Sequence, residues 1–271
     1  MQWGETRAPA GWSVLETVPE MPPSEPHRFL TPPAREPEGS QAILVGSPEH
    51  HTVIVAIDGP AGSGKSTTAR AVADRLGWLY LDTGAMYRAV GLAFRARSLP
   101  FTDADARTLL PGLDVRLQTG PDGTRVTLDG DDVTDRIRTP QAATDASLAS
   151  ALGPVRQAMV ALQRRAADGR DVVVEGRDIG TVVFPDADVK FFLVADLDAR
   201  ARRRLAQTGD ADRDAFESVR SALADRDHRD QSRDLAPLKP AADAVVLDTT
   251  ALTIDQQVEH VLDAVQAISA D

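Results

Sequence analysis

The sequence contains no cysteine, and aromatic residues make up only 4% of its 271 positions. Without cysteine there is no disulfide, no thiolate metal site and no cysteine nucleophile, so any metal must be held by oxygen ligands of the kind that Mg²⁺ prefers. No stretch approaches the ~18–20 consecutive apolar residues of a membrane span, and we expect no membrane segment. A hydrophobic content of 42% is enough for one large domain or one domain with an insertion.

The charged residues are also unbalanced in number and unevenly distributed along the chain. The net charge of -11 argues against a general nucleic-acid binder, because phosphate backbones are held by basic surfaces. Lysine occurs only at positions 65, 190 and 239, and all 31 aspartates lie after residue 50. An aspartate-rich, lysine-poor composition is typical of a protein adapted to high salt, and it also follows from GC-rich coding; the sequence leaves both explanations open.

Residues 1–50 differ in composition from the rest of the chain. They carry nine of the 18 prolines, no aspartate and little apolar periodicity, which predicts a disordered N-terminal extension before a globular core over residues 51–271. The extension lacks the basic stretch and long apolar run of a secretory signal, so we expect a cytoplasmic protein. A partner-binding role for the extension and an alternative start at Met21 both remain open.

From residue 51 onward, apolar runs of strand length alternate with helical stretches. This alternation predicts an α/β fold, a three-layer sandwich in which helices flank a five-stranded parallel sheet. The strands are expected at 53–58, 78–81, 172–175, 189–194 and 244–247. The helices are expected at 64–76, 84–97, 154–167, 197–207, 213–228 and 253–269.

Residues 110–148 interrupt this alternation. The turn sequences Gly-Pro-Asp-Gly and Asp-Gly divide the interruption into three short segments at 115–117, 126–128 and 132–134. Turn residues at that spacing predict a small antiparallel β insertion in the α/β core.

The most specific motif is Gly-Pro-Ala-Gly-Ser-Gly-Lys-Ser at 59–66, which matches the phosphate-binding loop pattern G-x-x-x-x-G-K-[ST] at every fixed position. Glycines let successive backbone N–H groups turn toward one phosphate chain, Lys65 adds positive charge, and the Ser66 hydroxyl can reach Mg²⁺. A plain glycine turn is the alternative, and the strand before the loop and the helix after it argue against that alternative. The predicted triphosphate-binding residues are Gly59, Pro60, Ala61, Gly62, Ser63, Gly64, Lys65, Ser66 and Thr67.

Two further motifs follow predicted strands. Leu-Asp-Thr-Gly-Ala-Met-Tyr-Arg at 81–88 lies where open parallel sheets place ligands. Thr83 can cap the next helix, and Arg88 can hold a phosphate, although an arginine at such a position is more often a surface charge. Glu-Gly-Arg-Asp-Ile-Gly begins at residue 175, where Arg177 can hold phosphate and Asp178 can accept a hydrogen bond from an exocyclic amine. A surface charge at Arg88 and a local salt bridge at Arg177 and Asp178 are the alternatives.

A third motif is rich in both charges. Arg226, Asp230 and Arg233 fall at i, i+4 and i+7, so on a continuous helix they would share one face. Taken alone, this pattern is more typical of a solvated helix surface with salt bridges than of a binding site.

The four motifs together, over about residues 52–271, closely resemble the bacterial cytidylate kinases among the P-loop nucleoside monophosphate kinases. The resemblance implies transfer of the ATP γ-phosphoryl group to CMP or dCMP, with Mg²⁺ as cofactor, in pyrimidine nucleotide metabolism. It also implies a monomer with no nucleic-acid partner. The insertion is then the monophosphate-binding subdomain, and residues 197–212, with Arg200, Arg202, Arg203 and Arg204, resemble the lid over ATP.

The same resemblance assigns roles to single residues. The base-reading positions are Ser147, Arg156 and Asp178, and the ribose-contacting pair is Arg226 and Asp230. The monophosphate is surrounded by Arg88, Arg177 and Arg233. Thr83 and Tyr87 complete the acceptor site, with Thr83 standing where many family members carry serine, and the catalytic set is Lys65, Arg177 and Arg233.

Three rival functions remain in view. A kinase for UMP or another small metabolite is disfavoured by Asp178, because a carboxylate facing the O4 of uracil would repel it. A GTP-dependent switch would need an Asn-Lys-x-Asp motif, which the three lysines do not provide. A scaffold that binds nucleotide without turnover conflicts with an intact loop and the acceptor-site arginines.

Overall fold

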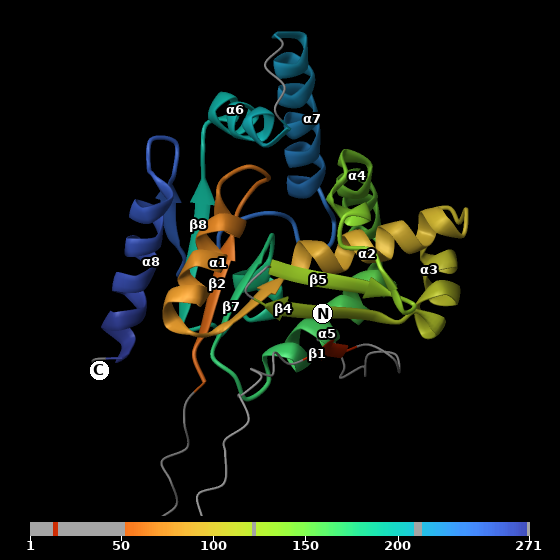
Figure 1. Cartoon of the computed structure of the whole chain (residues 1–271), viewed down its shortest axis with the longest axis horizontal. Coiled ribbons are helices and arrows are strands. Elements are labelled where there is room, and N and C mark those ends of the chain that lie inside the picture. The colour runs from red at the N-terminus through yellow and green to blue at the C-terminus, as the bar shows by residue number, and fades with distance from the viewer. Residues whose placement is uncertain (1–12, 16–51, 121–122, 209–212, 270–271) are drawn as a thin grey trace, which may run out of the picture.

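Five short apolar strands form one parallel sheet in the order β3-β7-β2-β8-β9 (Figure 1). The computed structural model describes residues 13–15, 52–120, 123–208 and 213–269. The strands are β2 (Ile54–Asp58), β3 (Leu79–Asp82), β7 (Val172–Gly176), β8 (Val189–Val194) and β9 (Val245–Asp248). All five predicted strands are confirmed, each to within one residue at either end.

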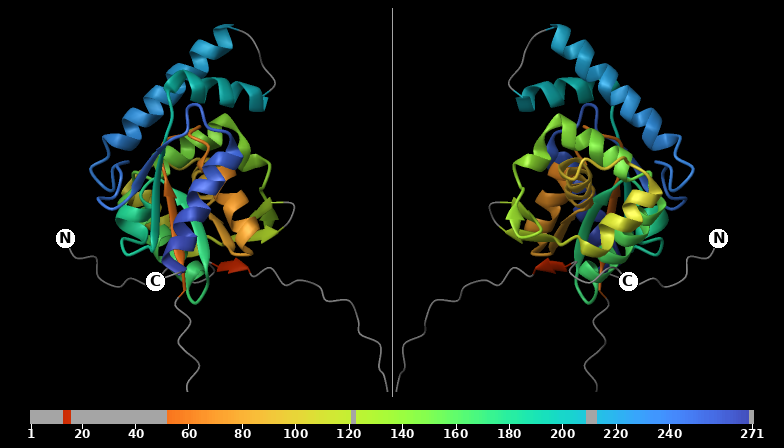
Figure 2. Two further views of the ribbon diagram at one scale, coloured as in Figure 1. Left: turned by 90° about the vertical axis from the view of Figure 1, so that its left-hand side faces the viewer. Right: turned by 90° about the vertical axis from the view of Figure 1, so that its right-hand side faces the viewer.

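The sheet is covered by helices on both faces, and the residues of its central strands alternate between two cores. Val55 and Ile57 of β2 pack with α1 (Lys65–Leu76) and α8 (Ile254–Ser269), whereas Ala56 packs toward the opposite face. That face is covered by α2 (Thr83–Ala96) and α5 (Gly153–Ala167). Figure 2 views the molecule from these two sides. Burial on both faces explains why the central strands read as unbroken apolar runs.

A second sheet of four strands, in the order β1-β4-β5-β6, lies against α2. Three of its strands form the predicted antiparallel insertion, and their bounds are β4 (Val115–Gly120), β5 (Gly123–Leu128) and β6 (Asp131–Asp132). The third segment lies earlier than expected, because the backbone already turns at Asp129 and Gly130, which both have positive φ. The small β insertion is therefore confirmed with a shifted last strand.

The fourth strand, β1 (Ser13–Leu15), was not predicted. It pairs in parallel with β4, with Val14 opposite Leu117. Because residues 1–50 read as an extension without a sheet pattern, sequence reasoning assigned no strand here. The rest of that predicted extension, 1–12 and 16–50, lies outside the described residues.

Two short helices were also missed, α3 (Asp103–Leu109) and α4 (Pro140–Ala149). Both begin at a threonine whose hydroxyl accepts a backbone N–H three residues later, Thr102 from Asp105 at 3.2 Å and Thr139 from Ala142 at 3.1 Å. These caps are recognisable signals. The helices are too short, however, for the apolar periodicity on which the other assignments rested.

The helices α6 (Leu197–Thr208) and α7 (Arg213–Gln231) project together beyond the carboxyl ends of the strands (Figure 1). They pack through Ala201 and Leu223, which meet Ala61 of the phosphate loop. The other predicted helices agree with the structure to within one residue, whereas α7 runs three residues further than expected. None of the helices in the described part of the chain has the length and apolar character needed to cross a membrane.

The packing of α4 on α2 depends on a glycine, which gives a test of the fold. A Cβ at Gly91 would lie 2.8 Å from both the carbonyl carbon and the Cβ of Asp145. We expect Gly91→Ala to lower the free energy of unfolding by about 1–3 kcal/mol, because overpacking exceeds the gain in helix propensity. Urea denaturation measures this change. Gly112→Ala, where no atom lies within 4 Å of the added Cβ, should stay within about 0.5 kcal/mol, and equal losses in the two variants would contradict the steric explanation.

Candidate active site

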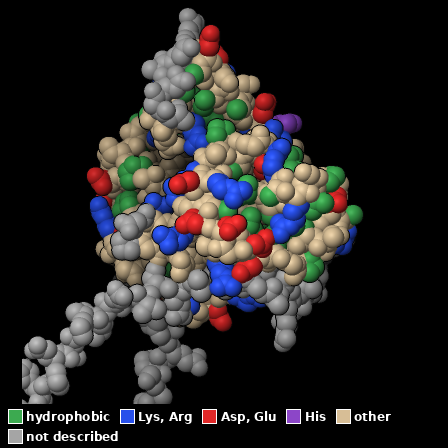
Figure 3. Space-filling model, turned by 45° about the vertical axis from the view of Figure 1, so that its right-hand side comes forward, with side chains coloured by type: hydrophobic (Ala, Val, Ile, Leu, Met, Phe, Trp, Pro, Cys, Tyr) green, Lys and Arg blue, Asp and Glu red, His purple; other side chains and the backbone are tan. Residues whose placement is uncertain are grey.

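A cavity opens at the carboxyl edge of the parallel sheet, beneath α6 and α7. Figure 3 shows this face hollowed under the projecting helices, with basic side chains around the hollow. All ten residues predicted for the acceptor site line this cavity: Thr83, Tyr87, Arg88, Ser147, Arg156, Arg177, Asp178, Arg226, Asp230 and Arg233. Lys65 and Ser66 from the phosphate loop line it as well. The fold thus brings the predicted donor loop and the predicted acceptor residues to one place.

The phosphate loop follows β2 directly, and its glycines are required by its backbone. Gly59, Gly62 and Gly64 have φ values of 148°, 79° and 97°. A Cβ at Gly59 would lie 2.2 Å from the carbonyl oxygen of Leu193. The tight turn places Lys65 and Ser66 in the first turn of α1, where the helix N-terminus favours negative charge.

Lys65 is buried, and its Nζ donates to the carbonyl oxygen of Pro60 at 3.2 Å. Burial lowers the pKa of Lys65 to about 7, and the positive charge of Arg177 lowers it further, while Glu175 opposes the shift. Burial therefore outweighs the stabilising negative charge of Glu175.

The end of β7 carries a carboxylate that sequence reasoning did not assign to the site. Glu175 accepts from the hydroxyls of Ser66 and Tyr80, each at 2.8 Å, and its backbone carbonyl accepts from Thr83 Oγ1 at 2.7 Å. Its position at the end of a strand beside the loop-bearing strand was the available signal. Within the part of the chain that the structure describes, no three His, Cys, Asp or Glu side chains are grouped to hold a metal by themselves.

The predicted cap of α2 was wrong by one residue. Asp82, not Thr83, is the N-cap, and its Oδ1 accepts from the backbone N–H of Ala85 at 2.9 Å. Burial raises the pKa of Asp82, and the nearby negative charge of Glu175 raises it further. Thr83 instead starts the helix and bonds the end of β7, which joins the acceptor motif to the strand beside it.

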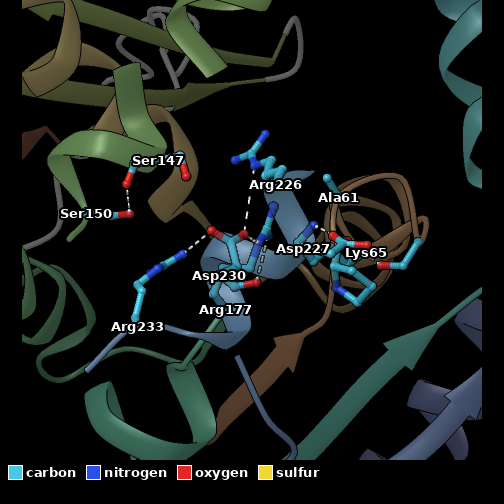
Figure 4. Close-up of polar contacts among 12 residues, drawn as sticks. Ala61, Lys65, Ser147, Ser150, Arg177, Arg226, Asp227, Asp230 and Arg233 are labelled. Carbon is cyan, nitrogen blue, oxygen red and sulfur yellow. Dashed lines mark hydrogen bonds and ion pairs between the residues drawn. The ribbon is translucent and has the colours of Figure 1, made fainter. Parts of the chain in front are cut away.

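Three arginines surround one buried carboxylate on the acceptor side (Figure 4). Asp230 accepts from Arg177 Nε at 3.1 Å and from Arg233 Nη2, and Arg226 Nε lies 3.8 Å away. Although burial of Asp230 opposes the shift, these arginines hold its pKa below the usual range. Burial and the adjacent Arg177 lower the pKa of Arg226 to about 9. With Arg88 also lining the cavity, the site holds an excess of positive charge.

The charged motif on α7 does not form one continuous helix face. The helix ends at Gln231, so Arg226 and Asp230 are helical and Arg233 lies beyond the end. Arg233 still reaches Asp230 because the chain turns back there, with Leu238 N–H bonding the carbonyl of Asp230 at 2.8 Å. The pattern is therefore not a solvated surface, since Asp230 is only 1% exposed.

A buried ion pair lies at the other side of the acceptor cavity. Arg156 of α5 donates through Nη2 to Asp178 Oδ2, and both side chains are buried. Arg156 Nη1 is buried without a hydrogen-bond partner in the described residues. Ser147 and Ser150 of α4 also line the cavity, with the Ser150 hydroxyl donating to the Ser147 carbonyl at 2.9 Å. A buried donor without a partner is costly, and a ligand acceptor or water would satisfy it.

Two arginines of the predicted lid contact the phosphate loop. Arg200 Nη1 donates to the carbonyl of Ala61 at 3.2 Å and pairs with Asp227 of α7 at 2.5 Å. Arg203 Nη1 donates to the carbonyl of Gly62 at 3.4 Å. Arg202 is exposed, and residues 209–212 of the predicted lid lie outside the described residues.

A parallel sheet with a glycine-rich phosphate loop, and an arginine-lined acceptor cavity beside that loop, define a P-loop kinase. Residues 55–267 match the family model described as cytidylate kinase. The cytidylate kinase of Salinibacter ruber is 51% identical over 221 residues, covering 79% of this chain and 97% of that protein. The cytidylate kinase of Shouchella clausii is 47% identical over 214 residues, covering 78% of this chain and 95% of that protein. The chain belongs to the cytidylate kinase family, as its motifs predicted.

The lowered pKa of Lys65 predicts proton uptake when triphosphate binds. At pH 8 a lysine with a pKa of about 7 carries roughly a tenth of a charge, and bound phosphates should restore its charge, so ATP binding should take up nearly one proton. Calorimetry in two buffers of different ionisation enthalpy measures the uptake. Lys65→Met should abolish it and Lys239→Met, at an exposed lysine, should keep it. ATP binding without uptake by the unsubstituted protein would mean that Lys65 is already charged.

Proposed function

We propose that this chain transfers the γ-phosphoryl group of ATP to CMP or dCMP, giving ADP and CDP or dCDP. The observation that carries the proposal is that one cavity brings Lys65 and Ser66 of the phosphate loop together with an arginine cluster and a buried Arg156–Asp178 pair. Membership of the cytidylate kinase family supports the same reaction. The loop suits a triphosphate, and the other side of the cavity suits a monophosphate with an amine-bearing base.

Recognition of cytosine is assigned to Asp178, Arg156 and Ser147. The Asp178 carboxylate can accept from the exocyclic amine. Arg156 Nη1, which has no hydrogen-bond partner among the described residues, can donate to an acceptor atom on the base ring. Uracil carries a carbonyl where cytosine carries the amine. Its O4 has a partial negative charge and would be repelled by the Asp178 carboxylate. A preference for cytosine over uracil therefore follows from the proposal.

The acceptor phosphate is assigned to Arg88, Arg177 and Arg233, and the ribose to Arg226 and Asp230. An oxygen of the acceptor phosphate forms a bond to the γ-phosphorus while the bond from that phosphorus to the β–γ bridging oxygen breaks, and ADP leaves with the electron pair. The nucleophile is already an oxyanion, so no general base is needed. The protein's part is to hold two polyanions in line and to neutralise their charge, with Lys65, Arg177 and Arg233 nearest the moving group.

The proposal includes Mg²⁺ and ATP, and the residues present fit the metal. Ser66 and Glu175 supply oxygen ligands of the hard type at 2.8 Å from each other, and they would hold the ion together with phosphate oxygens. The metal supplies charge neutralisation at the β- and γ-phosphates. The loop backbone from Gly59 to Thr67 would surround the same phosphates.

We further propose a monomer that acts in the cytoplasm on small nucleotides, without a nucleic-acid or membrane partner. The acidic net charge of -11 supports the absence of a general nucleic-acid surface. Every predicted acceptor residue comes from this one chain, so the site needs no contribution from a second copy.

The reaction is tested by following ADP release with ATP, Mg²⁺ and each of CMP, dCMP, UMP and AMP. We expect strong turnover with CMP or dCMP and little with UMP or AMP, because only cytosine matches Asp178 and Arg156. Turnover with none of the four, despite ATP binding, would support the scaffold alternative, and a preference for UMP would overturn the assignment of the base pocket.

Asp178→Asn tests the role of the carboxylate while preserving the size of the side chain. We expect the KM for CMP to rise by about tenfold or more and the KM for ATP to change less than about twofold. The reason is that, of the two substrates, only the base of CMP would contact Asp178. The ratio of UMP to CMP turnover should also rise. Asp114→Asn, which removes a carboxylate from a surface pair with Arg116, serves as the matched control. Equal losses for CMP and ATP would contradict the base-reading role.

A further inference from the structure

Asp58 is a buried carboxylate that the mechanism above does not use. It is the last residue of β2, immediately before the phosphate loop, and it is 4% exposed. It does not line the acceptor cavity. A side chain at this place, between the end of a strand and the phosphate loop, can connect that loop to neighbouring strands.

Both oxygens of Asp58 accept from the backbone of the acceptor motif. Oδ1 accepts from the N–H of Ile179 at 2.9 Å, and Oδ2 accepts from the N–H of Gly180 at 2.8 Å. These residues directly follow Arg177 and Asp178, which line the cavity. The Asp58 side chain, at the end of the strand that bears the phosphate loop, therefore fixes the peptides that directly follow Arg177 and Asp178. These two residues are the predicted phosphate-binding and base-reading residues.

The segment that Asp58 holds has little freedom to adjust. A π-helical turn, Ile179–Val183, begins here, and the carbonyl of Asp178 accepts from Val182 N–H at 2.9 Å. The Ile179 side chain fills the space beside Gly176, where an added Cβ would lie 2.6 Å from its Cδ1. A shift of Ile179 and Gly180 would therefore carry Asp178 and Arg177 with it.

The two bonds require a carboxylate specifically. Two backbone N–H groups face two oxygens, and an ionised carboxylate accepts from both. Asparagine has nearly the same shape, but its NH₂ group would face one of the two donors, so one buried N–H would lose its partner. The arrangement thus distinguishes Asp58 from a residue that only fills space.

We infer that Asp58 is a positioning residue, which sets the location of Arg177 and Asp178 relative to the phosphate loop and so sets the affinity for the acceptor nucleotide. The inference rests on the proposed function, because it assigns the residue to the acceptor half of that site. Asp58 acts through its two backbone partners, without touching either substrate.

Asp58→Asn tests the inference at pH 8. Burial raises the pKa of Asp58 to about 7, with Asp178 adding to the rise and the Ile179 and Gly180 N–H groups and Arg177 opposing it, so the carboxylate is ionised at this pH. We expect the dissociation constant for CMP to rise about tenfold and that for ATP to change less than about twofold, both measured by calorimetry without turnover. The KM for CMP should rise with the dissociation constant.

Asp188→Asn is the matched control. Asp188 Oδ2 accepts from Ile54 N–H at 2.8 Å, so it makes the same kind of bond at the opposite end of β2, away from the cavity. Asp188→Asn should leave both affinities unchanged even if it lowers the unfolding temperature. Equal weakening of CMP and ATP binding by Asp58→Asn, or the same CMP loss in Asp188→Asn, would overturn the positioning role.

Two outcomes keep this inference separate from the proposed function. If the unsubstituted protein turns over CMP and Asp58→Asn binds CMP normally, only the inference fails. If the unsubstituted protein neither binds nor phosphorylates CMP, the proposed function fails.

Should Asp58→Asn not fold, Asp58→Ser is a second test. Serine leaves room for a water at the second N–H, and the same selective loss of CMP affinity is expected. Normal CMP binding by Asp58→Ser would likewise overturn the inference.

Discussion

The parallel pairing of β2 with β7 is the constraint on which the site depends. Asp58 lies opposite Gly176 in this pairing, so the phosphate loop that follows β2 and the acceptor motif that follows β7 leave the sheet side by side. Parallel strands deliver their carboxyl ends to one edge, and ligands bind there. Glu175 strengthens the link, because its side chain bonds Ser66 of the loop while its backbone carbonyl bonds Thr83 of the acceptor side.

The second constraint is electrostatic. The chain is acidic as a whole, yet the cavity concentrates arginines around Asp230, and buried Lys65 has a lowered pKa. Like charges held together in a partly buried site cost free energy in the absence of a counter-ion. Anionic substrates relieve this cost, so the mutual repulsion of the cationic side chains favours the binding of two polyanions. Arginine is suited to this task because it stays charged and binds phosphate through two donors.

The helices α6 and α7 project together from the molecule (Figure 1), and they contact both the phosphate loop and the acceptor side of the cavity. Arg200 and Arg203 of α6 contact carbonyls of the phosphate loop, whereas Arg226 and Asp230 of α7 line the acceptor side. The Arg200–Asp227 pair joins the two helices at the loop. A movement of these two helices would therefore change both sides of the cavity together, which is the arrangement expected of an enzyme that must exclude water from phosphoryl transfer.

The sequence alone determined the five strands, the longer helices and the phosphate loop, because periodicity and the loop pattern are local properties of the chain. Its motifs, with the family resemblance they carry, also named most of the residues that line the cavity, although not Glu175 or Ser150. Only the tertiary structure decided which carboxylates bond distant partners: Glu175 joins the loop to the acceptor motif, and Asp58 holds Ile179 and Gly180. The Glu175–Ser66 bond and both Asp58 bonds join residues more than 100 positions apart, so no local pattern reports them. The strand β1 was decided by its pairing with β4, whereas the helices α3 and α4 carry cap signals but too few residues for a clear apolar periodicity.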